Sequence, residues 1–309
     1  MFTAGKGRLV ALAAVAVGAT VALAGCASGD PLDEGSGGES AATGGAIVIG
    51  SQDYYSNEII AEIYAQALEE NGFEVDRQFR IGQREVYLPE IESGEIDLFP
   101  EYTGNLLQYY VPDTEARTSD EVYSELEGAL PEGLHVLDQA PATDQDSYNV
   151  TAAFSEEFGV TSLEDLAGVP EPITLGGNAE LETRPYGPEG LQATYGVDVG
   201  FTAIEDSGGA LTVKALVDDQ VQMVNIYSAD PNIATNDLVT LEDPKGLFLA
   251  SNVVPVASEK VTDDVAAVID AVSAALTAED LVAMNAESVN DERSAEDIAA
   301  DWLSEKALF

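Results

Sequence analysis

Residues 46–99 read AIVIGSQDYYSNEIIAEIYAQALEENGFEVDRQFRIGQREVYLPEIESGEIDLF and alternate short β-branched runs with stretches of helical spacing. The run at 46–50 ends in Gly-Ser. Residues 57–70 follow, with apolar side chains three or four positions apart, as in an amphipathic helix. A strand, a short helix and another strand complete the pattern, at 73–81, 85–92 and 96–99. This βαβαβ order favours a mostly parallel sheet flanked by helices.

A second series of the same kind begins near Ser147. Its expected strands are 148–152, 173–175, 200–203 and 221–226, and its expected helices are 189–195 and 210–217, with a helical turn at 163–166. An apolar, β-branched stretch at 247–256 precedes three helices, at 263–276, 278–288 and 295–303. We expect Trp302, on the last helix, to pack into the first lobe. Two α/β lobes enclose a cleft, and ligands of such sheets bind at strand carboxyl ends and at domain junctions.

The first residues indicate export. Lys6 and Arg8 precede a continuous apolar run at 9–23, which is too short to span a bilayer, so residues 1–25 are typical of a signal peptide. The ending Leu-Ala-Gly-Cys resembles a bacterial lipobox, in which Cys26 becomes the lipid-bearing first residue. Cys26 is the only cysteine, so no internal disulfide can form. Residues 26–44 are rich in Gly, Ser and Ala and predict a flexible tether.

The charge balance is strongly acidic. Lysine and arginine total 12, aspartate and glutamate total 57, and the formal net charge is -45. Loss of residues 1–25 removes Lys6 and Arg8 and no acid, which changes that charge to -47. Nucleic acid and anionic surfaces are therefore implausible partners. The acids could gather cations, or they could keep the protein soluble in high salt, where repulsion is screened. Their spread over the whole chain favours the second interpretation.

The sequence contains no recognisable catalytic motif. His135 is the only histidine, and it lies in an apparent strand, GLHVLD, without an obvious serine or cysteine partner. HExxH, GxSxG and Walker-type glycine loops are absent from the sequence. Acidic pairs occur throughout, so none of them indicates a carboxylate-only hydrolase in particular. We therefore expect a binding protein without metal or cofactor, and keep a lipoprotein hydrolase as the weaker alternative.

Several tyrosines follow the ends of expected strands. Tyr54 and Tyr55 follow the first strand, Tyr102 follows IDLFPE, and Tyr227 follows VQMVNI. Rings at strand ends can converge on a cleft and form a cage. A quaternary ammonium has no N–H to donate, and ring faces hold it with roughly 0.5–2 kcal/mol per contact. The alternative for each ring is packing at a lobe edge with its hydroxyl in water.

Five segments, in this order and spacing, resemble the glycine betaine/choline/carnitine-type substrate-binding proteins of ABC importers. They are IVIGSQDYYSNEIIAEIYAQALEENGFEV, GEIDLFPEYTGN, ETRPYGPEGL, IEDSGGALTVKALVDDQVQMVNIYSAD, and LEDPKGLF with NVVPV. The resemblance covers residues 46–309. It implies a two-lobed α/β fold of the type II periplasmic-binding-protein kind, with the ligand cleft between the lobes.

The resemblance also implies lobe boundaries. We expect residues 45–143 and 245–309 to form the first lobe and residues 144–244 the second. The chain is expected to cross between the lobes near 140–147 and again near 240–252.

The resemblance assigns site residues one by one. Tyr102, in EYTGN, matches a wall of the family's aromatic cage, and Asn105 matches a polar contact to the ligand's carboxylate. Arg184, in ETRPYG, matches the arginine that holds this carboxylate from the second lobe, a role that suits the paired, coplanar donors of a guanidinium. Tyr227, in NIYSAD, matches a second cage ring, with Asp230 close behind it.

Gln52, just after the first strand, is a further candidate for the cleft wall. The sequence departs from the family at two other rings. Tyr148 is offset by two residues from a family tyrosine, whose position is taken by Asp146, although an offset of two keeps the same strand face. Another family tyrosine is absent near residues 250–252, which read Ala-Ser-Asn. Three tyrosines could complete the cage: Tyr54, Tyr55 and Tyr186.

These observations predict a monomeric solute-binding protein, lipid-anchored through Cys26 on the extracytoplasmic face of the membrane. Its expected ligand is a quaternary-ammonium osmoprotectant such as glycine betaine, choline or carnitine, which it would deliver to an ABC permease. The altered cage keeps another small zwitterion, or an amino-acid-like solute, as an alternative ligand.

Overall fold

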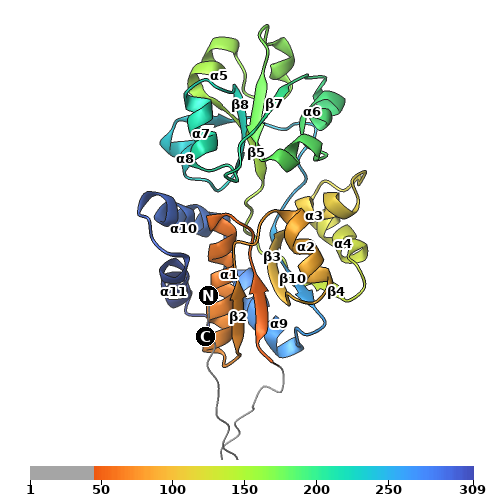
Figure 1. The fold of residues 1–309 in the computed structure, drawn as a ribbon, viewed down its shortest axis with the longest axis vertical. Coiled ribbons are helices and arrows are strands. Elements are labelled where there is room, and N and C mark those ends of the chain that lie inside the picture. Colours follow the sequence, from red (N-terminus) through yellow and green to blue (C-terminus); the bar gives the residue numbers. More distant parts are fainter. Residues whose placement is uncertain (1–44) are drawn as a thin grey trace, which may run out of the picture. The chain divides into compact units, whose positions relative to one another are not determined.

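The computed structural model describes residues 45–309 (Figure 1). The expected signal peptide at 1–25, the tether at 26–44 and Cys26 lie outside these residues. Within residues 45–309, no helix combines the length and the apolar character needed to cross a membrane.

Two five-stranded sheets organise the described part of the chain. The first has the order β2-β1-β3-β10-β4. Its strands are β1 (Ile47–Gly50), β2 (Val75–Gln78), β3 (Leu98–Tyr102), β4 (Leu134–Val136) and β10 (Val253–Ser258). The second has the order β7-β6-β8-β5-β9. Its strands are β5 (Asp146–Thr151), β6 (Thr174–Gly177), β7 (Gly200–Ala203), β8 (Met223–Tyr227) and β9 (Leu238–Thr240).

Helices cover both faces of the first sheet. Alternate strand residues point to opposite faces, so Ile49 and Val253 belong to one apolar cluster and Phe99 and Val254 to another. Four helices contribute to the first cluster: α1 (Tyr55–Glu70), α9 (Asp263–Ala275), α10 (Ala278–Asn290) and α11 (Ala295–Lys306). Three contribute to the second: α2 (Arg84–Glu92), α3 (Thr103–Tyr110) and α4 (Ser119–Ala129). We call this sheet and its seven helices the first lobe.

The second sheet is covered in the same way. The short helix α5 (Ala152–Phe158) and α6 (Pro188–Tyr195) pack on one face, and α7 (Ala210–Val217) and α8 (Asn232–Thr235) on the other. Two 3-10 turns, η1 (Asp165–Gly168) between α5 and β6 and η2 (Ala179–Thr183) between β6 and α6, pack on the same face as α5 and α6. We call this group the second lobe. The exact lobe boundaries expected from the sequence, at 143/144 and 244/245, stay a prediction.

Two chain segments, 137–145 and 241–252, connect the sheets, and Figure 1 shows both passing between them. They meet in an antiparallel bridge between Thr143 and Asn252. Each segment feeds a strand that runs against its neighbours, since β5 is antiparallel to β8 and β9, and β10 is antiparallel to β3 and β4. The mostly parallel arrangement is as expected, since β1 is parallel to β2 and β3, and β6 is parallel to β7 and β8. The exception in each sheet is the one strand that enters from the other lobe and therefore runs in the opposite direction.

The expected helices agree closely with the structure, whereas two expected strands were too long. Of the expected strand 73–81, only Val75–Gln78 forms β2. Of the apolar stretch 247–256, only residues from Val253 onward form β10. Leu247 and Leu249 instead pack into the cores of the two lobes. Trp302 packs against the first lobe as expected, within the cluster that contains α1 and β1.

Candidate functional site

A cavity lies between the two sheets, and both lobes line it. Five of the residues expected at the site contribute to its wall: Gln52, Tyr102, Asn105, Arg184 and Tyr227. Gln52 follows β1, Tyr102 ends β3 and Tyr227 ends β8, so the cavity lies at the carboxyl ends of strands, where ligands of such sheets bind. The space open to the centre of a water-sized sphere is about 40 Å³. A single water needs roughly 10–15 Å³ by this measure, so the cavity suits a small solute.

Four tyrosines line the cavity, namely Tyr54, Tyr102, Tyr186 and Tyr227, and Tyr54 contacts both Tyr102 and Tyr227. The ring of Tyr54 stacks on that of Tyr227 with 4.8 Å between centroids, and its hydroxyl donates to the Tyr102 hydroxyl at 2.5 Å. Burial raises the pKa of Tyr54, Tyr102, Tyr186 and Tyr227, so all four keep their protons at neutral pH. Because Tyr54 lies against one face of Tyr227, fewer ring faces are free for a cation than the count of rings suggests.

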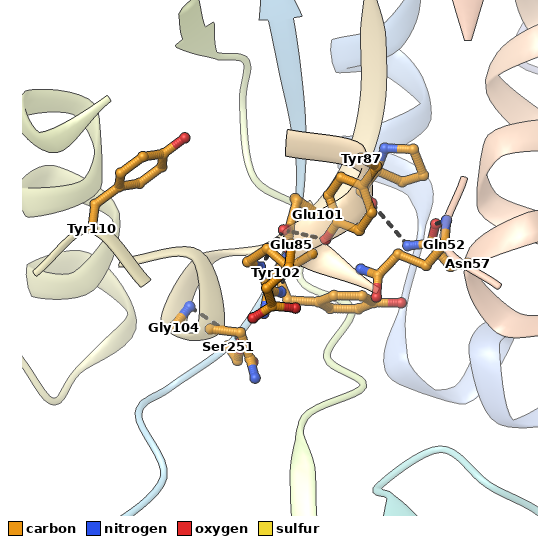
Figure 2. A network of polar contacts seen from close by, with 12 residues as sticks. Gln52, Asn57, Glu85, Tyr87, Glu101, Tyr102, Gly104, Tyr110 and Ser251 are labelled. Carbon is orange, nitrogen blue, oxygen red and sulfur yellow. Dashed lines mark hydrogen bonds and ion pairs between the residues drawn. The ribbon is translucent and has the colours of Figure 1, made fainter. Parts of the chain in front are cut away.

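The turn from β3 into α3 positions Tyr102 and Asn105. A Cβ at Gly104 would lie 2.7 Å from the Ala250 carbonyl oxygen, so only glycine fits this close approach to the crossing segment. The Gly104 N–H donates to the Ser251 hydroxyl at 3.1 Å, and that hydroxyl donates to the Asn105 amide oxygen at 2.8 Å. Figure 2 shows Ser251 beside Gly104.

The Asn105 amide group is fully used within the protein. Its Nδ2 donates to Asp146 at 2.5 Å and to the Tyr186 hydroxyl at 3.0 Å. Since an amide has two N–H groups, none is left for a ligand carboxylate in this state. Asn105 instead joins the first lobe to Asp146 and Tyr186 of the second lobe.

The β1–α1 loop holds Gln52 at the cavity wall. Asn57 accepts the Gln52 backbone N–H at 2.8 Å and donates to the Pro100 carbonyl at 2.8 Å, which ties this loop to β3. The contact fixes the Gln52 backbone and leaves its side-chain amide turned to the cavity, next to the Tyr102 ring (Figure 2).

A buried ion pair at the cavity wall was not expected from the sequence. Arg84, the first residue of α2, donates to both oxygens of Glu101 at 2.7 and 2.9 Å. The Tyr87 hydroxyl donates to the same carboxylate at 2.6 Å, and Figure 2 shows Tyr87 beside Glu101. Burial by itself lowers the pKa of Arg84, but Glu101 and Tyr87 together hold that pKa above its ordinary value. Arg84 lines the cavity, and these bonds use only its Nε and Nη2.

Arg184 reaches the cavity from the second lobe. It follows η2, and its guanidinium pairs with Glu85 of the first lobe at 2.9 Å. Its chain path depends on Gly187, where a Cβ would lie 2.0 Å from the Leu181 carbonyl oxygen. Arg184 thus connects the lobes directly, and it can bind an anionic ligand group only while sharing its donors with Glu85.

Carboxylates without a cationic partner form another part of the wall. Asp144 accepts from the Ser56 hydroxyl at 2.8 Å and from the Ala229 N–H at 2.9 Å. Burial raises the pKa of Asp144 to about 6, although these hydrogen bonds act in the opposite direction. Asp146 and Glu180 also line the cavity. Among residues 45–309, no lysine or arginine forms an ion pair with any of these three groups.

Two expected site residues lie away from the cavity. Tyr148 is fully buried in the second-lobe core against Phe248, and its hydroxyl donates to the Tyr186 carbonyl at 2.5 Å. It shares a strand face with Asp146 but lies two residues further from the cavity, roughly 7 Å along the strand. Tyr55 does not line the cavity either, since its hydroxyl donates across the lobes to Asp230 at 2.8 Å.

The sequence interpretation missed Arg84, Asp144, Glu180 and Asn225 as cavity residues. The scarcity of basic residues could have drawn attention to Arg84, which is the first residue of α2. No comparable signal marked the acids, because carboxylates occur along the whole chain. The part of the chain that the structure covers contains no cluster of three or more side chains suited to hold a metal ion.

Residues 45–305 match the family model described as OpuAC, the substrate binding domain of the ABC-type glycine betaine transport system. The chain belongs to this family. The expectation from the sequence motifs is thereby confirmed, and the OpuAC family is a family of substrate-binding transport proteins.

Curated relatives and solved structures agree with the OpuAC assignment. The glycine betaine-binding protein YehZ of Escherichia coli is 28% identical over 276 residues, which span 84% of this chain and 90% of YehZ. The ergothioneine transport permease/ergothioneine binding protein EgtU of Helicobacter pylori is 20% identical over 205 residues, covering 65% of this chain and 36% of EgtU. A crystal structure described as a glycine betaine/carnitine/choline ABC transporter covers 85% of this chain and 99% of its own, with 17% identity and a TM-score of 0.69. It supports the fold, which is the expected two-lobed type.

Proposed function

We propose that this protein binds a small quaternary-ammonium or zwitterionic osmoprotectant in the cavity and delivers it to an ABC permease. Tyr102 and Tyr227 offer ring faces to the cationic head, and Arg184 holds the anionic end. Membership of the OpuAC family supports this proposal, as does the relative from Escherichia coli that is named for glycine betaine.

The charge of the cavity is the observation that carries the proposal. The two arginines in its wall, Arg84 and Arg184, are each paired with a glutamate, while three further carboxylates have no cationic partner among the described residues. A recess with this excess of negative charge attracts cations and repels anions. The ligand therefore carries a positive charge, alone or balanced by an anionic group.

The test is calorimetric titration with choline and glycine betaine, which share the cationic head but differ in the carboxylate. Tyr102→Ala and Tyr227→Ala should each weaken binding of both ligands by about 1–2 kcal/mol, and phenylalanine should largely preserve binding, since the ring face makes the contact. Arg184→Ala should weaken the binding of glycine betaine more than the binding of choline. Arg293→Ala makes the same charge change outside the cavity and should affect neither. Intact binding in both alanine variants of the tyrosines would contradict the proposed site.

The finer location is also a proposal: the protein is attached to the outer face of the cell membrane through a lipid on Cys26. The sequence Leu-Ala-Gly-Cys after a short apolar run supports it. Cys26→Ser should release the protein from the membrane fraction or leave it unprocessed, as measured by fractionation and intact mass. Unchanged membrane attachment and mass would contradict it.

We further propose that the protein catalyses no reaction. His135, its only histidine, is exposed on the edge strand β4 and lies outside the cavity wall. Among the described residues, those that line the cavity include no serine, threonine, cysteine, lysine or histidine. Purified protein should give no turnover with a panel of ester and phosphate substrates, and saturable turnover that Asp146→Asn abolishes would overturn this part of the proposal.

A further inference from the structure

Three buried polar atoms of the cavity wall have no hydrogen-bond partner among residues 45–309. They are Nε2 of Gln52, Nδ2 of Asn225 and Oε2 of Glu180. The Gln52 and Asn225 side chains are deeply buried, at 5% and 9% exposure. Leaving such atoms without a partner is costly, so the occupant of the cavity has to supply the missing partners.

Two of the three atoms need a hydrogen-bond acceptor, and the third needs a donor. The unpartnered Nε2 of Gln52 and Nδ2 of Asn225 are donors, and a ligand carboxylate would accept from them. Glu180 is an acceptor and needs a donor. A ligand that displaces water from Glu180 without offering an N–H or O–H loses the hydrogen bond that the water made. A fully methylated ammonium offers none.

Glu180 is held in place by its surroundings. It belongs to η2, whose Leu181 N–H donates to the Asn178 carbonyl at 3.0 Å and whose Ala179 N–H donates to Glu205 at 3.1 Å. Leu181 is buried against Gly177. The nearest arginine along the chain, Arg184, gives its guanidinium to Glu85 rather than to Glu180. The Glu180 carboxylate therefore faces the cavity without a compensating charge.

The contacts among the tyrosines also favour recognition by hydrogen bonds. Because Tyr54 stacks on Tyr227 and its hydroxyl donates to that of Tyr102, part of the ring surface that would hold a methylated head is already covered. Recognition of the cationic end therefore depends more on hydrogen bonds in this cavity than it would in an aromatic cage whose ring faces are all open.

We propose that Glu180 is a specificity-determining residue that accepts a hydrogen bond from the ligand. The cavity then prefers zwitterions that carry an N–H or O–H near the cationic centre over counterparts without one. This inference rests on the proposed function, because it refines which solutes of that class the protein selects.

Two matched ligand pairs test the inference by calorimetric titration. N,N-Dimethylglycine differs from glycine betaine by an N–H in place of a methyl group, and carnitine differs from γ-butyrobetaine by one hydroxyl. We expect the donor-bearing member to bind about tenfold more tightly, or better, in at least one pair, since a charge-assisted hydrogen bond is at stake. The pair that shows the preference identifies the donor as N–H or O–H.

Variants at Glu180 separate a hydrogen bond from a charge effect. Glu180→Ala should abolish the preference within the pair, and Glu180→Gln, which keeps an acceptor oxygen, should retain part of it. A diffuse charge effect would instead weaken both members of a pair equally. Glu182→Ala is the matched control, because Glu182 is exposed on the same 3-10 turn and does not line the cavity. Thermal melting checks that all variants fold.

Equal affinity within both pairs, or a preference that persists in Glu180→Ala, would overturn the inference and leave the proposed function standing. Failure of choline and all four pair members to bind the unmodified protein would overturn the proposed function and this inference with it.

Discussion

Asp144 is buried between the two lobes, where it accepts hydrogen bonds from the Ser56 hydroxyl and the Ala229 N–H. Burial is the main reason that its pKa rises to about 6, and the nearby Asp230 and Asp146 add to the effect. Asp144 is therefore mostly protonated at pH 5 and mostly ionised at pH 7. A group that gains negative charge over this range makes the cavity more attractive to cations as the pH rises.

We predict that choline, whose own charge is constant, binds more tightly at pH 7 than at pH 5. The gain should be about fivefold or more, which corresponds to a Coulomb interaction of ~1 kcal/mol across a few ångström. Asp144→Asn should make the affinity nearly independent of pH over the same range. Titrations at both pH values measure this, and an unchanged pH dependence in Asp144→Asn would assign the effect to another acid such as Asp230.

At the residue scale, the sequence predicted those parts of the cavity wall that follow strand ends. Gln52, Tyr102 and Tyr227 fall there because strand ends can be recognised from apolar runs. Tyr148 was expected there as well. The alternation of side chains along a strand predicts which face Tyr148 lies on, but it does not predict how far along the strand the cavity extends. Glu180 could not be singled out among so many acids, and the scarcity of basic residues did not by itself place Arg84 at the cavity, because a cavity position depends on how two separate sheets face each other.

At the scale of secondary structure elements, the connection from η2 to α6 carries Arg184 and Tyr186 to the cavity. Its path brings Gly187 so close to the Leu181 carbonyl oxygen that a Cβ would lie at 2.0 Å. Because the obstacle is backbone, it cannot move aside as a flexible side chain would. This connection, and with it one wall of the cavity, requires glycine at 187, as well as at 190 in α6, where a Cβ would lie 1.9 Å from the Pro185 carbonyl oxygen.

We predict that Gly187→Ala destabilises the protein by about 1–3 kcal/mol, the usual range for overpacking, and weakens ligand binding by displacing Arg184. Denaturant unfolding and titration measure the two effects. Gly168→Ala is the control, since a Cβ there meets nothing within 4 Å. Equal stability of the two variants would show that the connection tolerates the extra carbon.

Helix and strand positions were largely predictable from periodicity, because the amphipathic patterns of α1, α7 and α9 repeat over several turns. The direction of β5 and β10 was not predictable from the sequence, since the βαβ pattern alone favours parallel neighbours. Only the crossing of the chain between lobes, with Thr143 bridged to Asn252, explains why these two strands run against their neighbours.

At the scale of the whole molecule, the dominant feature is a formal charge of -45. Acids outnumber bases 57 to 12, so most carboxylates have no cationic partner and repel one another. Salt shortens the range of this repulsion from about 10 Å at 0.1 M to about 3 Å at 1 M. The folded state, in which the charges are closest, gains most from screening.

We predict that the melting temperature rises by about 5 °C or more between low and molar sodium chloride at pH 7, which corresponds to roughly 2 kcal/mol for a protein of this size. At a pH near the sequence pI of 4.1, where the net charge is small, the salt effect should largely disappear. A melting temperature that is independent of salt at pH 7 would contradict this reading of the acidity.

Trp302 is the only tryptophan in the chain. It lies on α11, 5% exposed, in the apolar cluster that also contains α1 and β1 of the first lobe, and it does not line the cavity. Excited at wavelengths that tyrosine does not absorb, the protein therefore has one emitter, placed in one lobe only. Its emission should stay constant while ligand fills the cavity and shift to the red when the first lobe opens to water. Comparison of that signal with far-ultraviolet circular dichroism, which reports on both lobes, reveals whether the two halves of the protein melt together or in succession.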